Sequence, residues 1–364
     1  MNCVPVSLRL LLIALASGIG ASSLAAAKKP EPAESRTQEE LEAATRLQVF
    51  LDRANFSPGK LDGHYGDFTR KALALYRQSR GEPAQLSPAT GENSATPPDV
   101  TGIDLASVGP ALITYTVTDL DVQNVGAIPD KVRAQAKLKA LPYRDAGEAL
   151  AEKFHCDRAF LEQLNPGKTK IIKPGDQLAV PNVEPFEVAT VKDLRPGSEI
   201  TLPVANEIPD EAEAPTPKPD PGQASGTENV ATVVDVDTKT NFLTVLEDTK
   251  LIAAYPVTIG SAQTKSPIGE YKVRGVAKLP KFRYDEEMLK HGERSSDFQM
   301  LPPGPNSPVG VIWIALDKKG IGLHGTRDPD SIGRSASHGC VRLANWDIVR
   351  LVARVKAGAS VSIH

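Results

Sequence analysis

Apolar residues recur at three- and four-residue spacing from Thr37 onward, which is the period of an amphipathic helix. This first stripe consists of Leu41, Ala44, Leu47, Leu51 and Ala54. Two glycine-containing turn signals follow at 58–59 and 62–63. We expect Asp67 to cap a second helix, with an apolar face made of Phe68, Ala72, Leu75 and Tyr76. The pattern predicts a small helical domain over residues 38–82.

The residues of this helical pair also carry a family resemblance. Leu47-Gln48, then Asp62-Gly63 with Gly66, then Thr69 and Ala72 occur in the order found in the small helical peptidoglycan-binding domains. The resemblance implies that residues 38–82 bind the bacterial cell wall. The alternative is a helical hairpin that only packs on its neighbours.

The next region combines strand and helix patterns. The segment ALITYTVTDLDV alternates like a strand, and DAGEALAEKFHCDRAFLEQLN contains two helical stretches, with Cys156 between them as a small buried thiol. KPGDQLAVPNV then reads as a turn and a short strand. The order resembles a LysM module, a glycan-binding unit of cell walls, over residues 112–184. Asn165-Pro166, Gly175, Leu178 and Pro181 carry the resemblance, although a long stretch separates Tyr115 from the helices.

Two segments without periodicity divide the chain. Residues 83–100 are rich in Pro, Ser and Thr, and residues 203–229 are rich in Pro, Ala and acidic residues, so both are predicted to be linkers. Residues 230–364 are instead dominated by β patterns. They begin with two strand-like runs around the polar turn DTKTN and include one good helix, NWDIVRLVARV, whose end we place at Gly358. ASVSIH is expected to form a last strand.

These patterns predict a multidomain protein. Its parts are a small α-helical N-terminal domain, an α+β LysM-like middle module and a mostly-β C-terminal domain over residues 230–364. Residues 1–27 have the order of a secretory signal: Arg9, an apolar run, and Ala25-Ala26-Ala27. We therefore expect export to the periplasm or cell wall, and a retained N-terminal anchor is the alternative. The net charge of −3 lacks the basic excess of nucleic-acid-binding proteins.

Cysteine is scarce, and its placement suggests chemistry. Removal of residues 1–27 leaves two of the three cysteines, Cys156 and Cys340. They either form one disulfide, as in many exported proteins, or Cys340 keeps its thiol for reaction. A thiol attacks as the thiolate and needs a base or a cation nearby.

The neighbours of Cys340 supply both kinds of group. His324 ends the strand-like GIGLHG, where a side chain is held rigidly. His338 would share a face with Cys340 if residues 338–340 are extended. Gly339 lets a substrate approach the backbone, and its amide and that of Cys340 are candidate oxyanion donors. Arg342 is a candidate for binding a carboxylate or biasing the thiol towards thiolate. The other histidines are expected at the surface.

His324-Gly325-Thr326, followed by Ser337-His338-Gly339-Cys340-Val341-Arg342, resembles the L,D-transpeptidase catalytic domain of bacterial cell walls. The upstream segment YPVTIGSAQTKSPIGEYKV fits the same family. The resemblance implies that Cys340 is the nucleophile and His324 the base, oriented by the carbonyl of Gly325. It further implies that Ser337, His338, Gly339 and Arg342 shape the substrate and oxyanion site.

The implied reaction is transfer between peptidoglycan stem peptides, with no cofactor and no metal. Cys340 attacks the third residue of a tetrapeptide stem, and an amine of a second stem completes a 3→3 cross-link. Water as acceptor would make the protein an L,D-carboxypeptidase, and a protein lysine would tether that protein to the wall. The expected partners are therefore stem peptides and glycan strands, with a wall-anchored protein as an alternative acceptor. Two other classes are a non-catalytic wall-binding protein and a thiol redox protein, although the chain lacks C-x-x-C.

Overall fold

The computed structural model describes residues 37–83, 96–194, 232–260, 266–291, 293–333, 335–337 and 339–364. All of these residues belong to one compact unit of the chain, Arg36–His364. The expected signal (1–27) and the second linker (203–229) lie outside the described residues, as does most of the first linker. Among the described residues, no helix has the length and apolar character needed to cross a membrane.

The N-terminal part consists of two helices, α1 (Gln38–Arg53) and α2 (Asp67–Ser79). Thr37 caps α1 in a capping box with Glu40, so this start is where the pattern predicts it. Asp67 is the first residue of α2 and not its cap, because Gly66 occupies the cap position. Asp67 still lies in the first turn, where a carboxylate complements the positive end of the helix.

The middle part contains a pair of strands with helices between them. Strand β1 (Leu112–Thr116) pairs antiparallel with β2 (Gln177–Pro181). The predicted strand ALITYTVTDLDV is shorter than expected, because Thr118 and Asp121 form a capping box that begins a helix. The helices and 3-10 turns of this part are η1 (Leu105–Val108), α3 (Asp119–Gln123), α4 (Val132–Gln135), α5 (Ala146–Lys153), α6 (Arg158–Leu164) and η2 (Val188–Asp193).

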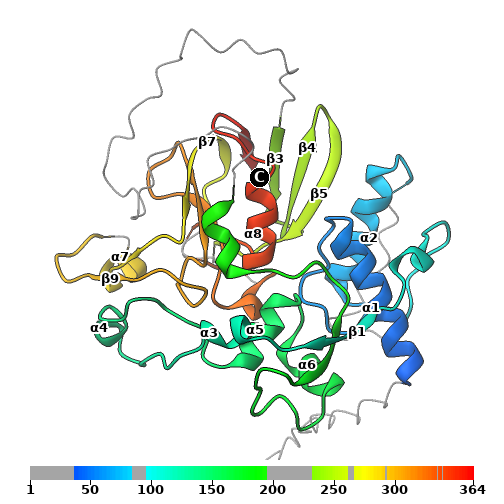
Figure 1. The fold of residues 1–364 in the computed structure, drawn as a ribbon. Helices are drawn as coiled ribbons and strands as arrows, with labels where there is room; N and C mark the ends of the chain where they lie inside the picture. The colour runs from blue at the N-terminus through cyan, green and yellow to red at the C-terminus, as the bar shows by residue number, and fades with distance from the viewer. Residues whose placement is uncertain are drawn as a thin grey trace, which may run out of the picture. The chain divides into compact units, whose positions relative to one another are not determined.

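The C-terminal part is built on a sheet. Within the described ranges, eight strands pair in the order β13-β11-β10-β7-β14-β3-β4-β5, and β3, β4 and β5 lie side by side in Figure 1. Their bounds are β3 (Thr232–Asp237), β4 (Phe242–Glu247), β5 (Lys250–Pro256), β7 (Gly269–Lys278), β10 (Ile312–Leu316), β11 (Gly322–His324), β13 (Val341–Arg342) and β14 (Ser360–Ile363). The smaller elements are β6 (Ile259–Gly260), β8 (Phe282–Tyr284), α7 (Glu286–His291), β9 (Gln299–Leu301), η3 (Pro329–Ser331) and β12 (Ser335–Ser337). β6 pairs with β12, and β8 pairs with β9.

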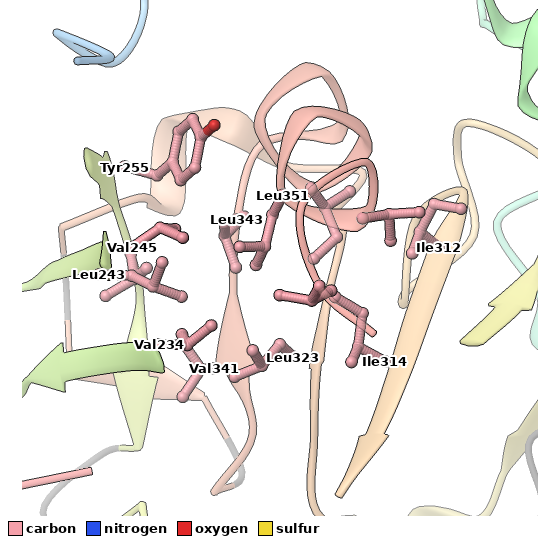
Figure 2. Packing of buried hydrophobic residues seen from close by; sticks show 14 of the residues in the cluster. Val234, Leu243, Val245, Tyr255, Ile312, Ile314, Leu323, Val341, Leu343 and Leu351 are labelled. Carbon is pink, nitrogen blue, oxygen red and sulfur yellow. The ribbon is translucent and has the colours of Figure 1, made fainter. Parts of the chain in front are cut away.

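Helix α8 (Asn345–Val352) covers one face of this sheet. Figure 2 shows Leu351 of α8 among side chains of the strands, including Ile314, Leu323 and Val341, and all four are fully buried. The predicted helix end at Gly358 is wrong, because α8 ends at Val352 and a turn leads from there into β14. Successive side chains of a strand point to opposite faces, so the residues that alternate with these core positions lie on the sheet face away from α8.

Candidate active site

Strand pairing places the candidate residues on one face of the sheet. Trp313 of β10 is opposite His324 of β11, and His324 is opposite Arg342 of β13. Directly paired residues share a face, so these three side chains lie on the side of the sheet away from α8. Cys340 comes two residues before Arg342 and packs against a small cluster that contains Trp313. The fold therefore brings Cys340, His324 and Arg342 to the same face.

The imidazole of His324 is held in one orientation. Its Nδ1 lies 2.6 Å from the carbonyl oxygen of Gly325, a contact in which Nδ1–H donates and Nε2 keeps its lone pair. The ring stacks on the indole of Trp313, with centroids 5.1 Å apart and an interplanar angle of 14°. His324 is 4% exposed. Nε2 is thus the ring nitrogen that can accept a proton.

The surroundings favour the neutral forms of both groups. Burial and, to a smaller extent, the nearby Arg342 lower the pKa of His324 to about 3, against the opposing effect of the hydrogen bond to Gly325. Burial also raises the pKa of the Cys340 thiol, while a backbone hydrogen bond from Gly322 and the charge of Arg342 act the other way. The suggestion that Arg342 biases Cys340 towards thiolate is correct in direction, but burial outweighs it. The resting pair is therefore a thiol and a neutral imidazole.

Arg342 carries a buried donor that faces no acceptor among the described residues. Its Nε is buried and has no hydrogen-bond partner in the part of the chain that is described. The backbone around it is fixed, because the amides of Arg342 and Thr258 each donate to the other's carbonyl over 2.9 Å. Burial lowers the pKa of Arg342 from its usual value. A buried N–H of this kind gains free energy from an incoming acceptor such as a carboxylate.

The chain bends within the second half of the motif, between β12 and β13. β12 ends at Ser337 and β13 begins at Val341, with Gly339 at φ +111° between them. His338 lies outside the described residues, and the side chain of Ser337 is not described either. We expected His338 and Cys340 to share a face only if residues 338–340 were extended. The positive φ of Gly339 is not an extended conformation. The positive φ is the conformation for which glycine is suited.

Three residues that support the site were not singled out from the sequence. Trp313 alternates with Ile312 and Ile314, which is a signal that it faces away from the core, but its stacking on His324 depends on strand register. Asn345 is fully buried below Gly325, and Glu152 of α5 contacts it. Neither the contact of Asn345 with Gly325 nor its contact with Glu152 has a local sequence signal.

The second cysteine belongs to the middle part. Cys156 is 3% exposed, as predicted for a small buried thiol, and burial raises its pKa. Neither Cys156 nor Cys340 is in a disulfide. The expectation that the remaining histidines are at the surface is wrong for His155, which is buried, donates from Nδ1 to Oδ1 of Asp52 over 3.0 Å and stacks on Trp346. No group of three His, Cys, Asp or Glu side chains among the described residues is arranged to hold a metal ion.

A thiol and a neutral imidazole on one face of a β-sheet are the groups that cysteine-dependent acyl-transfer enzymes use. Residues 231–363 match the family described as YkuD, the L,D-transpeptidase catalytic domain. The chain is 33% identical over 135 residues to the putative L,D-transpeptidase YqjB of Bacillus subtilis, a match that covers 36% of this chain and 69% of that protein. The chain therefore belongs to the L,D-transpeptidase family, a family of cell-wall enzymes, and carries its catalytic domain at the C-terminal end.

Other comparisons are more limited in extent. The putative L,D-transpeptidase YkuD of Bacillus licheniformis is 31% identical over 121 residues, which cover 33% of this chain and 58% of that protein. The chain thus spans 58% to 69% of the length of these two curated relatives. The crystal structure of L,D-transpeptidase 3 from Mycobacterium tuberculosis with a faropenem-derived adduct matches at 17% identity and a TM-score of 0.31, over 37% of this chain and 60% of that chain. A TM-score this low does not establish a common fold.

Proposed function

We propose that this protein is a peptidoglycan L,D-transpeptidase that forms 3→3 cross-links through a thioester on Cys340. The observation that carries the proposal is the orientation of His324. Its Nδ1–H is occupied by the carbonyl of Gly325, which leaves Nε2 as a base on the sheet face that also bears Cys340. The third member of the triad is then a backbone carbonyl and not an acid.

The proposed reaction has two acyl-transfer steps. The Cys340 sulfur bonds to the carbonyl carbon of the third residue of a donor stem, and His324 Nε2 takes the thiol proton. The amide bond to the terminal D-alanine breaks, and the leaving amine receives that proton. An amine of a second stem then attacks the thioester, passes its proton to His324 and releases the Cys340 thiol. The new amide bond is the cross-link.

The remaining candidate residues are proposed to bind the donor. The backbone amides of Gly339 and Cys340 would donate to the oxyanion of each tetrahedral intermediate. Arg342 would use its buried Nε–H for a carboxylate of the stem peptide, which is supported by the lack of a partner for this atom among the described residues. Ser337 and His338 are proposed to shape the same site.

The parts before residue 231 are proposed to hold the enzyme on the wall. We assign a peptidoglycan-binding-like domain to 38–82 and a LysM-like module to 112–184, with linkers at 83–100 and 203–229. The antiparallel pair β1 and β2 with α5 and α6 between them supports the second assignment. A signal at 1–27 would direct the protein to the periplasm or cell wall.

Three acceptors are compatible with the proposed thioester. A stem amine gives the cross-link, water gives an L,D-carboxypeptidase, and a protein lysine gives a tethered protein. A non-catalytic wall-binding protein is the candidate from another class, and the intact pairing of His324 with Gly325 argues against it.

The test uses purified muropeptides with tetrapeptide stems and the mature chain. We expect 3→3 dimers and released D-alanine from the wild type, and neither from Cys340→Ala. Cys156→Ala is the matched control, because Cys156 is a buried thiol outside the site, and it should keep activity. Turnover that persists in Cys340→Ala would exclude the thioester, and tripeptide monomers in place of dimers would identify water as the acceptor.

A further inference from the structure

The middle part of the chain reaches the residues that support His324. Glu152 lies on α5, and Asn345 is the first residue of α8 in the C-terminal part. Asn345 Nδ2 donates to Glu152 Oε1 over 2.8 Å. Both side chains are buried, with Glu152 8% and Asn345 0% exposed. A buried amide and carboxyl need such partners, so this contact is fixed in the folded protein.

Asn345 lies directly against the backbone that orients the histidine. Its Oδ1 accepts from the amide of Val311 over 3.1 Å. A Cβ atom added to Gly325 would come within 2.2 Å of that oxygen, and a Cβ on Gly310 would also come within 2.2 Å of it. Asn345 is therefore packed between the start of β10 and the residue whose carbonyl accepts from His324.

Glu152 and Val311 together determine which way the Asn345 amide points. The amide N–H of Val311 can only donate, and Oε1 of Glu152 accepts whether or not the carboxyl carries a proton, so the NH₂ end of Asn345 faces Glu152 and its oxygen faces Val311. Glu152 is held in turn by the hydroxyl of Tyr143, which donates to Oε2. Without Glu152, the partner that Nδ2 keeps among the described residues is the carbonyl of Pro305, at a longer distance of 3.4 Å.

The segment before Gly310 is held by the same part of the chain. The amide of Leu141 donates to the carbonyl of Pro303 over 2.8 Å, and Asn306 Nδ2 donates to the carbonyl of Pro142 over 2.8 Å. Gly304 lies so close to Leu141 that a Cβ would be 2.2 Å from its carbonyl oxygen. The middle part therefore contacts the segment that leads to Gly310, and through Glu152 it contacts Asn345, which packs against Gly325.

We propose that Glu152 and Asn345 are positioning residues for the acyl-transfer reaction, which hold the Gly325 carbonyl where it orients His324. This inference rests on the proposed function, because that function supplies the reaction in which the two residues act. The contacts themselves concern only the support of His324. It makes the middle part a structural component of the active site as well as a candidate wall-binding module. Displacement of a catalytic group by about 1 Å can cost about 100-fold in rate, so a lost support should be measurable.

The test compares two substitutions of equal length at one position in the full mature chain. Glu152→Gln keeps an acceptor for Asn345, whereas Glu152→Met fills the same space without one. Lys153→Met is the matched control, because Lys153 is the next residue of α5 and pairs with Asp121 over 2.7 Å, away from Asn345. Asn345→Ala serves as a second disruption, and melting temperatures show that each variant is folded.

Two readouts separate positioning from general loosening. The first is the rate of Cys340 acylation by p-nitrophenyl acetate, read by mass spectrometry, with His324→Ala as the lower limit. The second is kcat and KM with the tetrapeptide donor. We expect Glu152→Met and Asn345→Ala to lower the acylation rate and kcat about tenfold, with KM changed less than about twofold. Glu152→Gln and Lys153→Met should stay within about twofold of wild type in both.

Acylation of folded Glu152→Met at the wild-type rate would overturn the inference, as would an equal loss in Lys153→Met. If Asn345→Ala fails to fold, the pair of Glu152 variants still decides. A wild-type protein that is acylated by the ester but leaves tetrapeptides unchanged would contradict the proposed function instead. In that case the ratio of acylation rates between the Glu152 variants would still test whether Glu152 positions His324.

Discussion

At the scale of single residues, burial favours the neutral forms of both His324 and Cys340, and this bears on how the proposed reaction would begin. In the proposed mechanism, the thiol proton moves to Nε2 of His324 as the sulfur attacks. The hydrogen bond from Nδ1 to Gly325 offsets part of the cost of the positive ring that results. Trp313 limits ring rotation by stacking.

The neutral pair predicts an unusual pH dependence of acylation. An ordinary histidine base loses activity as pH falls through about 6.5. The pKa of His324 is lowered to about 3, so its base form is present above that pH and is lost only below it. We expect the rate of Cys340 acylation by the tetrapeptide to be nearly constant from pH 7.5 to about pH 5, measured by quenched mass spectrometry. A tenfold fall with a midpoint near pH 6.5 would contradict this.

The sequence pattern already pointed to the candidate site at this scale. Residue type and spacing singled out His324, Cys340 and Arg342, and strand pairing and packing place these three on one sheet face, whereas His338 and the side chain of Ser337 lie outside the described residues. Trp313 could be assigned only to a sheet face, because its partner depends on the register between β10 and β11.

At the scale of elements, alternation on β10 separates the core from the site. Ile312, Ile314 and Leu316 face α8, while Trp313 and Ala315 face the candidate site. Gly322, opposite Ala315 on β11, leaves room for the indole of Trp313. A Cβ on Gly322 would lie 2.7 Å from that ring and 2.7 Å from the carbonyl oxygen of Ile314.

Gly322→Ala should therefore damage both packing and chemistry. The added methyl group displaces Trp313, and with it His324, so we expect a loss of about 1 to 3 kcal/mol in stability and a fall of at least about tenfold in acylation rate. Gly358→Ala is the control, because Gly358 has φ +83° but no neighbour within 4 Å of a Cβ. It should lose stability only. Urea unfolding and acylation kinetics measure the two effects, and wild-type acylation in Gly322→Ala would exclude the role of this gap.

Local sequence signals explain which elements could be predicted. The capping box at Thr37 and the polar turn between β3 and β4 are short-range features, and the structure has both. The bounds that were missed depend on neighbours in space. The strand at β1 was predicted too long because the capping box at Thr118 begins a helix there. The helix α8 was predicted to continue towards Gly358 because Val355 keeps the apolar spacing, and Val355 is indeed buried, but beyond the end of the helix.

At the scale of the whole described chain, a buried polar network joins the three parts. Asp52 of α1 accepts from Arg350 of α8 over 3.0 and 2.7 Å and contacts His155 of the middle part. Arg350 and His155 hold the pKa of Asp52 well below its usual range, although burial opposes them. Asp52 and Arg350 are 298 residues apart in sequence, so no local pattern could have predicted their pairing.

Loss of Arg350 should destabilise the protein strongly. Arg350→Met leaves the Asp52 carboxylate buried with His155 as its remaining partner, and we expect a loss of about 3 to 5 kcal/mol in the free energy of unfolding. Arg354→Met is the control, because Arg354 donates to the carbonyl of Arg350 over 2.8 Å and forms no ion pair with a carboxylate among the described residues, and it should cost less than about 1 kcal/mol. Equal losses in guanidinium unfolding would show that the ion pair does not join the parts.

Glu152 should make stability fall as pH rises. Burial raises its pKa from 4.5 to about 7, so the folded state holds this proton more tightly than the unfolded state. The resulting stabilisation is complete below pH 4.5 and is lost as pH rises through 7. A shift of this size corresponds to about 3 kcal/mol. Glu152→Gln should be flatter than wild type in unfolding free energy between pH 5 and 8, and identical slopes would contradict the assignment.

The central claim is that Cys340 is acylated with His324 as its base. The most direct measurement is intact-protein mass spectrometry of the mature chain, quenched in acid within seconds of mixing with a tetrapeptide donor and no acceptor. We predict a mass increase equal to the donor less D-alanine, located on Cys340, that forms slowly in His324→Ala and is absent in Cys340→Ala. An adduct of the same mass in Cys340→Ala, or equal rates in wild type and His324→Ala, would contradict it.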